Sequence, residues 1–208
     1  RSSFLHTLRV LQADVLAITA RDSVLTCVPM FHANAWGLPF AAPAVGAKLV
    51  LPGRQLDGAH LAALIKAENV TLGVGIATVW LGLVEHLETH GGETPSLKRI
   101  VVGGAPLPSA LMERIERRLG VIVQTSWGMT ELSPGGTFAS PNDPERVAAL
   151  SGRPTIGVDL LITDAAGQAL PEQRDVEGHL RVRGAAVVER YFGEERSATD
   201  ADGWFATG

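Results

Sequence analysis

The sequence has few of the residues that would cross-link it, charge it strongly or anchor it in a membrane. It contains one cysteine, Cys27, which excludes an internal disulfide and makes a thiolate metal site implausible. The longest uninterrupted apolar run, residues 35–47, contains two prolines and is too short to span a bilayer. No signal peptide opens the sequence. The single thiol and the missing signal therefore predict a cytoplasmic protein without a transmembrane segment.

The charge of the chain is low and mixed. Charged residues make up 19% of the sequence and hydrophobic residues 46%, which is typical of a folded globular protein. The formal net charge of −4 argues against general nucleic-acid binding. The only basic cluster, residues 114–118, alternates with glutamates and is better interpreted as a solvated helix face.

The chain changes character near residue 140. Before that point, apolar runs alternate with helical periodicity, which predicts an α/β fold with a mainly parallel sheet flanked by helices. The predicted strands are 24–30, 48–51, 71–76, 99–102 and 121–125, and the predicted helices are 3–18, 57–68, 78–89 and 108–119. After residue 144, strands at 158–163 and 179–183 with a turn at 164–167 predict a small antiparallel β unit. We expect two subdomains, 1–140 and 141–208.

The most informative segment, Ser-Trp-Gly-Met-Thr-Glu-Leu-Ser-Pro at 126–134, follows an apolar run. Ligands of open α/β sheets bind where such strands end. Trp127 offers a flat face for a base, and Gly128 lets a backbone approach closely. Thr130 offers a hydroxyl to phosphate, while Glu131 offers a hard oxygen to Mg²⁺. The alternative is an ordinary turn with one solvated glutamate, and the segment alone does not decide between the two.

Two other predicted strand ends carry weaker signals. Gly103 and Gly104 leave room for a ligand to lie against the backbone, although a simple chain turn explains them equally well. His32 follows the strand at 24–30, where a structural histidine is the alternative to a catalytic one. The chain contains neither G-x-G-x-x-G nor G-x-x-x-x-G-K-[ST], so neither a Rossmann dinucleotide site nor a P-loop is supported.

Taken in order, six segments resemble the successive motifs of AMP-forming acyl-CoA synthetases, which belong to the adenylate-forming superfamily. They are Pro-Met-Phe-His at 29–32, Gly-Gly-Ala-Pro at 103–106, Trp-Gly-Met-Thr-Glu at 127–131, Ser-Gly-Arg-Pro at 151–154, Gly-His-Leu-Arg-Val-Arg-Gly at 178–184 and Trp-Phe-Ala-Thr-Gly at 204–208. Each motif is modest alone, but six in the right order are specific, and they cover essentially the whole chain. His32 with Trp36, and Trp127 before Gly128, are most similar to the medium- and long-chain fatty-acyl-CoA ligases.

The resemblance implies part of the large N-terminal domain of an enzyme in fatty-acid metabolism. Such an enzyme activates a carboxylic acid with ATP as an acyl-adenylate and transfers it to CoA, so ATP or AMP, Mg²⁺ and CoA are the implied cofactors and cosubstrates. The acid, ATP and CoA are the implied partners. An adenylation domain that loads a carrier protein and a non-catalytic nucleotide- or acyl-binding module stay open as alternatives. A homo-oligomer also stays open.

Carried over position by position, the resemblance also implies roles for individual residues. The implied catalytic residues are Thr130, Glu131 and His32, with Glu131 as the Mg²⁺ ligand. The implied nucleotide-binding residues are Gly104, Ala105, Pro106, Thr125, Ser126, Trp127, Gly128, Met129 and Thr130. The implied acyl-binding residues are His32, Ala33, Trp36, Gly75, Thr78, Trp80 and Gly103. Trp36 would be the gate of an acyl tunnel, and core packing is the alternative for Trp80.

Several family elements have no counterpart in this sequence. Members of the family carry a phosphate loop upstream of the position of Arg1, an aspartate just after that of Gly208, and a C-terminal domain with a catalytic lysine. Lys48, Lys66 and Lys98 match no such motif. The resemblance therefore implies a central fragment of a larger enzyme, and it predicts that the chain by itself has no ligase activity.

Overall fold

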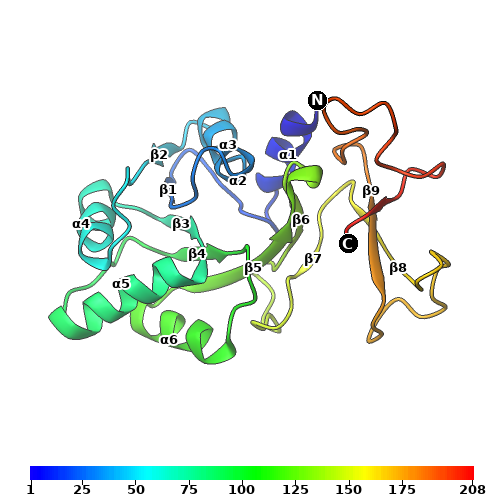
Figure 1. Cartoon of the computed structure of the whole chain (residues 1–208). Coiled ribbons are helices and arrows are strands. Elements are labelled where there is room, and N and C mark those ends of the chain that lie inside the picture. Colours follow the sequence, from blue (N-terminus) through cyan, green and yellow to red (C-terminus); the bar gives the residue numbers. More distant parts are fainter.

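The computed structural model describes the whole chain, residues 1–208, which forms two β-sheets and six α-helices (Figure 1). The strands are β1 Ser23–Thr26, β2 Lys48–Val50, β3 Leu72–Gly75, β4 Arg99–Val102, β5 Ile122–Gly128, β6 Gly135–Phe138, β7 Arg153–Pro154, β8 Asp159–Thr163, β9 His179–Arg183 and β10 Phe205–Ala206. The helices are α1 Ser2–Val10, α2 Ala33–Trp36, α3 Leu38–Ala44, α4 Gly58–Glu68, α5 Ala77–His90 and α6 Ser109–Leu119, with a 3₁₀ turn, η1, at Thr130–Leu132.

The large sheet has seven strands in the order β2-β1-β3-β4-β5-β6-β7, and the small sheet has three in the order β10-β9-β8. Strands β1 to β5 pair in parallel, whereas β6 and β7 join them antiparallel. The small sheet is antiparallel throughout. The predicted fold, a mainly parallel sheet with helices followed by a small antiparallel unit, is confirmed.

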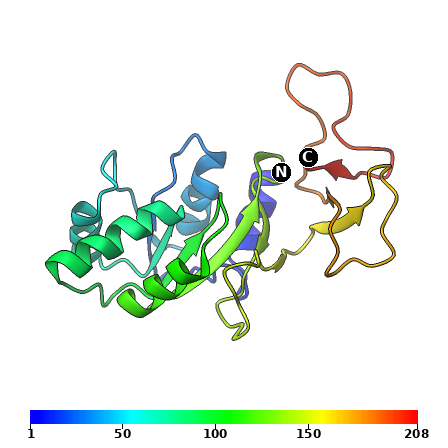
Figure 2. The same ribbon diagram turned by 60° about the horizontal axis from the view of Figure 1, so that its bottom comes forward.

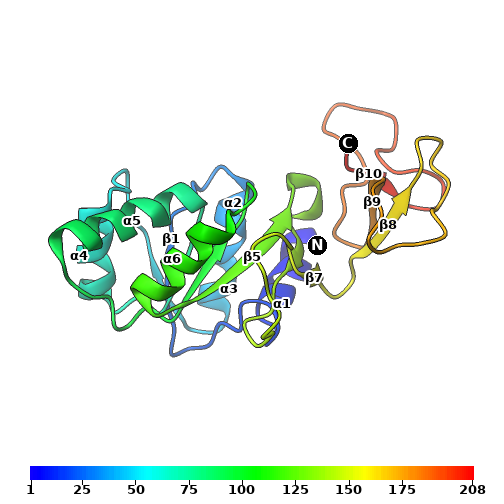
Figure 3. The same cartoon turned by 90° about the horizontal axis from the view of Figure 1, so that it is seen from below.

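Helices cover both faces of the large sheet because its strands are apolar on both faces. Leu25, Ile100 and Val123 belong to the core under α4, α5 and α6, whereas Val24 and Val101 belong to the core with α1 and α3. Successive strand residues point to opposite faces, so one apolar run supplies both cores. In Figure 1, α5 and α6 lie below the sheet and α1, α2 and α3 above it; seen from below, α5 and α6 come to the front (Figure 3). None of the helices has the length and apolar character that a membrane crossing needs.

Some predicted elements differ from the observed ones. The first helix ends at Val10 and does not reach residue 18, because the chain turns back on itself: the amide of Leu16 donates to the carbonyl of Val10, and Ala17 has a φ of 47°. Val15, Leu16 and Ile18 are still buried, although they no longer belong to a helix. The sequence did not predict α2, α3, β6, β7 or β10, which are short or rich in glycine and proline.

The small sheet lies beside the large one and is joined to it by the segment after β7 (Figure 2). Leu132 of η1 packs against Val182 of β9 and Phe205 of β10. The change from one sheet to the other takes place between Pro154 and Asp159, since β7 still belongs to the large sheet. A guanidinium nitrogen of Arg9, on α1, donates to the carbonyl of Gly157 at 3.1 Å and ties this connection to the large unit. The division of the chain at 140/141 stays a prediction.

Two glycines provide a test of the core under α5. A Cβ atom at Gly73 would lie 2.4 Å from Cη2 of the fully buried Trp80, whereas one at Gly82 would meet no atom within 4 Å. We expect Gly73→Ala to lower the free energy of unfolding by about 1–3 kcal/mol, because the ring has no space to move into. Gly82→Ala should raise it by up to about 1 kcal/mol, because alanine is the better helix former. Urea unfolding measures both, and equal stabilities would contradict this packing.

Candidate functional site

A cavity of about 330 Å³ opens at the carboxyl ends of β4 and β5. We call it the first cavity. Five segments meet there: α1, the residues around α2, the glycines after β4, the chain from β5 into η1, and β6. Its lining residues are His6, His32, Ala33, Trp36, Gly103, Gly104, Ser126, Trp127, Gly128, Met129, Thr130, Glu131, Pro134, Gly135 and Phe138.

A second cavity, of about 370 Å³, lies on the other side of the same strand ends. Gly104 and residues 126–128 line both cavities and so form the wall between them. Ala105, Pro106 and Thr125 line the second cavity alone, facing Ala148, Ala149 and Ser151 of the loop before β7. All the residues that the sequence predicted for a nucleotide therefore line one of two adjoining cavities.

Three of the predicted acyl-binding residues lie elsewhere. Trp80 is fully buried in the core under α4, α5 and α6, so core packing, the alternative, describes its place. Gly75 packs against the same indole ring and against Cys27, and Thr78 is exposed at the start of α5. Neither cavity is lined by these three residues, and the geometry lends no support to their assignment to an acyl pocket.

Close packing explains the glycines at the strand ends. A Cβ atom at Gly103 would lie 2.6 Å from the hydroxyl of Ser126 and 3.0 Å from Cη2 of Trp36. At Gly128 it would lie 2.2 Å from the carbonyl oxygen of Pro134. The chain can therefore turn back on itself directly after β5, and this turn places Thr130 and Glu131 at the rim of the first cavity.

The carboxylate of Glu131 is held by a residue from the β-rich part of the chain. The hydroxyl of Tyr191 donates to Oε1 of Glu131 at 2.9 Å, and this hydrogen bond to the carboxylate raises the pKa of Tyr191. The amide of Val188 also donates to the Glu131 carbonyl at 2.8 Å, and the hydroxyl of Ser133 donates to the carbonyl of Ala186. The segment 186–191 thus packs onto the loop that carries Glu131. No pattern in the sequence pointed to Tyr191, because the contact joins residues 60 positions apart.

The loop between β6 and β7 forms the outer wall of the second cavity and is fastened at several points. Arg146 donates to the carbonyl of Val123 at 3.1 Å and forms an ion pair with Glu116 of α6 at 2.8 Å. The hydroxyl of Thr125 donates to the carbonyl of Leu150. The side chain of Thr125 is therefore occupied within the protein, and its backbone is what it presents to the cavity.

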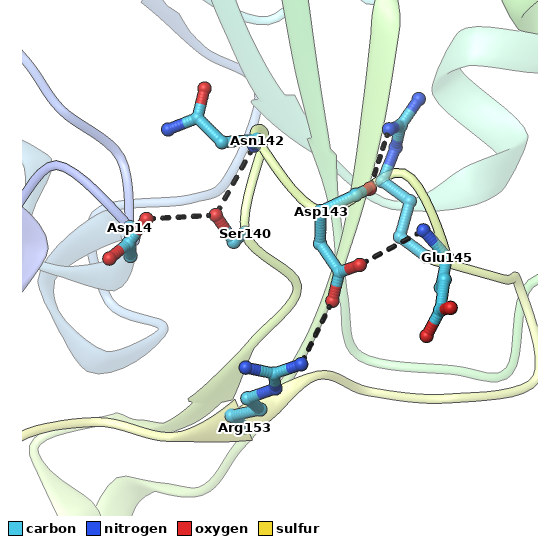
Figure 4. Close-up of polar contacts among 7 residues, drawn as sticks. Asp14, Ser140, Asn142, Asp143, Glu145 and Arg153 are labelled. Atoms are coloured by element: carbon cyan, nitrogen blue, oxygen red, sulfur yellow. Dashed lines mark hydrogen bonds and ion pairs between the residues drawn. The ribbon is translucent and has the colours of Figure 1, made fainter.

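The same loop has a polar cluster on its far side (Figure 4). The hydroxyl of Ser140 donates to Asp14 at 3.1 Å, Asp143 accepts from the amide of Glu145 at 2.9 Å, and Arg153 reaches Asp143 at 3.4 Å. These contacts connect the loop to the turn after α1 and to β7. The chain contains no group of three or more histidine, cysteine, aspartate or glutamate side chains arranged to hold a metal ion.

The chain around α2 follows a left-handed turn. Ala33, Asn34, Ala35 and Trp36 have φ angles of 45–54°, and Gly37 continues at 79°. L-residues rarely adopt this conformation, so the surroundings must hold it. The turn places His32, Ala33 and the half-buried Trp36 in the wall of the first cavity.

Two further side chains with reactive groups, His6 and Cys27, lie near the strand ends. His6, from α1, lines the first cavity although only 1% of it is exposed, and burial lowers its pKa. No sequence pattern pointed to His6, because a histidine inside a predicted helix has no distinctive neighbours. Burial raises the pKa of the Cys27 thiol to about 12, so this thiol stays protonated at neutral pH.

Known proteins similar to this chain share both its sequence and its fold. Residues 3–192 match the family described as AMP-binding enzyme. The whole chain is 43% identical to a medium-chain-fatty-acid–CoA ligase of Ectopseudomonas oleovorans and 40% identical to a long-chain-fatty-acid–CoA ligase of Thermus thermophilus, and it covers 40% of the length of each. O-succinylbenzoate coenzyme A synthetase of Bacillus subtilis, solved with ATP and a magnesium ion, is 26% identical. It has a TM-score of 0.84, with 100% of this chain and 42% of that chain covered.

The hydrogen bond between Tyr191 and Glu131 can be tested directly because the chain contains a single tyrosine. We expect Glu131→Gln to lower the pKa of Tyr191 toward its ordinary value of 10.0, since the neutral amide no longer favours the protonated phenol. Ultraviolet titration of the folded chain measures this pKa, with Glu93→Gln, an exposed glutamate far from the site, as the control. The same tyrosine pKa in the Glu131→Gln variant and the parental chain would contradict the contact.

Proposed function

The chain belongs to the family of AMP-binding enzymes, and we propose that it is the central portion of an ATP-dependent acyl-CoA synthetase. The observation that carries this proposal is the convergence of Trp127, Thr130 and Glu131 with the Gly103–Gly104 turn at one edge of the large sheet. In the proposed reaction, the carboxylate of an acid attacks the α-phosphate of ATP, which releases pyrophosphate and leaves an acyl-adenylate. The thiol of CoA then attacks the acyl carbon and displaces AMP.

For the nucleotide, the second cavity is the place that we propose for the base. Trp127 offers an aromatic face there, opposite Ala105 and Pro106, and Gly104 leaves the backbone accessible. Thr130, exposed on η1, can donate its hydroxyl to a phosphate oxygen. The site therefore supports a base on one side of the strand ends and phosphates at their tips, where charge develops during adenylation.

The donor set at the rim also fits a magnesium ion. Oε1 of Glu131 accepts a hydrogen bond from Tyr191, and its second carboxylate oxygen makes no hydrogen bond or ion pair within the chain. A hard carboxylate oxygen beside a hydroxyl suits this ion, which usually takes one or two carboxylates together with phosphate oxygens. A magnesium ion bound there would supply charge neutralisation for the phosphates. Glu131 would hold it, and Tyr191 would fix the orientation of the carboxylate.

For the acid, we propose the first cavity, between His32, Trp36 and Phe138. Two apolar rings and a backbone turn suit an aliphatic chain, and the two ligases with 40–43% identity are named for medium- and long-chain fatty acids. His32 lies at the mouth of the cavity, where a carboxylate would approach the phosphates. The cytoplasmic location and the use of CoA stay predictions that the cavity geometry does not address.

The test of this function uses the longer protein that contains the chain. We expect it to catalyse exchange of pyrophosphate into ATP only when an aliphatic acid is present, and to form the acyl-CoA when CoA is added. Exchange without acyl-CoA would point to a carrier protein as the acceptor. Nucleotide binding without exchange for any acid in a panel of chain lengths would contradict an enzymatic role.

Replacement of Glu131 is the sharpest test of the site. We expect Glu131→Ala in the longer protein to lower kcat/KM for adenylation by roughly 10²-fold or more, because it removes a preorganised charge and not a core side chain. Glu93→Ala, an exposed glutamate outside both cavities, is the matched control. Near-parental activity of Glu131→Ala at saturating Mg²⁺ would remove Glu131 from the mechanism.

Replacement of Trp36 tests the acyl side. We expect Trp36→Ala to change the dependence of the rate on acyl-chain length more than the KM for ATP, because its indole lines the first cavity and not the second. Unfolding would instead indicate core packing, since truncation of a buried aromatic costs about 3–5 kcal/mol. A folded variant with an unchanged chain-length profile would contradict the proposed gate.

A further inference from the structure

The imidazole of His6 fills the space between the left-handed turn and β6, at the back of the first cavity. A Cβ atom at Gly37 would lie 2.4 Å from its Cδ2, and one at Gly135 would lie 2.9 Å from its Cε1. The ring thus touches both segments at positions where a side chain would collide with it. Figure 1 shows α1, which carries His6, between α3 and β6. His6 is therefore placed to set the distance between the two walls of the cavity.

One polar contact links this ring to the turn. Nε2 of His6 lies 3.0 Å from the carbonyl oxygen of Trp36, the last residue of the left-handed run. The oxygen can only accept, so Nε2 carries the proton and donates. Nδ1 is buried and has no partner, so the bond to Trp36 is the only hydrogen bond that orients the ring. Burial lowers the pKa of His6, which agrees with a neutral ring.

The turn needs such support because its backbone is unfavourable. Four consecutive residues without the freedom of glycine have φ angles of 45–54°, a left-handed conformation that L-residues disfavour. Within the turn, the amide of Gly37 donates to the carbonyl of Asn34 at 3.0 Å, and Ala35 is fully buried. These contacts fix the middle of the turn. The carbonyl of Trp36, at its end, is fixed by His6.

We propose that His6 is a positioning residue: by donating from Nε2 to the carbonyl of Trp36, it stabilises the left-handed turn that directs Trp36 and His32 at the first cavity. It thereby contributes to the acyl-chain selectivity of the enzyme. Only the selectivity rests on the proposed function, because the hold on the turn is a property of the chain itself. His6 has no contact that would let it take part in proton transfer.

The hold on the turn can be measured in the 208-residue chain labelled with 5-fluorotryptophan. We expect its four tryptophans to give separate fluorine signals, of which Trp36→Phe identifies the one from Trp36. We expect His6→Leu, which keeps the bulk and removes the donor, to shift or split the Trp36 signal while that of Trp204 stays unchanged. His6→Gln, which restores a donor of similar reach, should recover the single parental signal.

His60 provides the matched control, since its Nε2 lies 3.2 Å from the carbonyl of Pro52, far from the cavity. His60→Leu should leave the Trp36 signal in place. An unchanged Trp36 signal in a folded His6→Leu chain would overturn the proposal. Loss of all four dispersed signals in both His6 variants would overturn it as well, because His6 would then serve the fold as a whole.

The selectivity is tested in the longer protein. We expect His6→Leu to change the ratio of kcat/KM between short and long acids severalfold, with a smaller change in the KM for ATP and with recovery in His6→Gln. A shifted Trp36 signal with an unchanged ratio of kcat/KM between short and long acids would overturn the proposed contribution of His6 to selectivity. If the parental protein activates no acid at all, the proposed function fails, and the fluorine spectra still decide the positioning role.

Discussion

The parallel register of four neighbouring strands is the constraint on which the rest of the structure depends. Thr26 of β1, Val74 of β3, Val101 of β4 and Gln124 of β5 lie level with one another, so β1, β3 and β4 end at nearly the same height. β5 continues past them to Gly128, where it pairs with β6. The segments that follow them therefore meet at one edge of the sheet, as in other open α/β folds. A slip of one residue would reverse the faces of a strand; in β5 it would exchange the apolar Val123 of one core for the buried amide of Gln124. The packing of the strands against the helices therefore fixes the register, and the register in turn fixes the edge of the sheet at which the cavities open.

A second level of organisation comes from segments that are not part of this register. Glu131 is held by the backbone of Val188 and by the hydroxyl of Tyr191, which belong to the chain between β9 and β10. The position of the carboxylate thus depends on how the β-rich part of the chain packs against η1. The second cavity, which we propose for the base, depends equally on the loop before β7, which Arg146 ties to α6. A shift of either segment would alter the site without disturbing a strand of the large sheet.

The sequence predicted the parts of the fold that depend on local pattern. The strands at β4 and β9, and the helices near α4, α5 and α6, were found because periodicity, an Asp57 cap and glycines mark them. The motifs that it placed at strand ends line the two cavities, because parallel strands bring their carboxyl ends to one edge of the sheet. It could not separate Trp36 from Trp80: both follow strand ends, and only packing shows that one lines a cavity and the other fills the core. His6 and Tyr191 were missed because their roles arise from contacts between distant elements.

The two walls of the first cavity differ in how firmly they are fixed. The wall made by β4 and β5 is part of a hydrogen-bonded sheet. Its glycines, Gly103 and Gly128, cannot be replaced without a clash, because a Cβ atom there would lie 2.2–3.0 Å from neighbouring atoms. The wall made by residues 33–36 has an unfavourable backbone and relies on a few contacts, so its conformation is the more easily changed. Residues that hold phosphates must keep one geometry throughout the reaction, whereas a wall that admits acids of different length must adapt. Under the proposed function, the firmly held chain after β5 suits Thr130 and Glu131 as phosphate and magnesium ligands, and the strained turn suits Trp36 as the wall that meets the acyl chain.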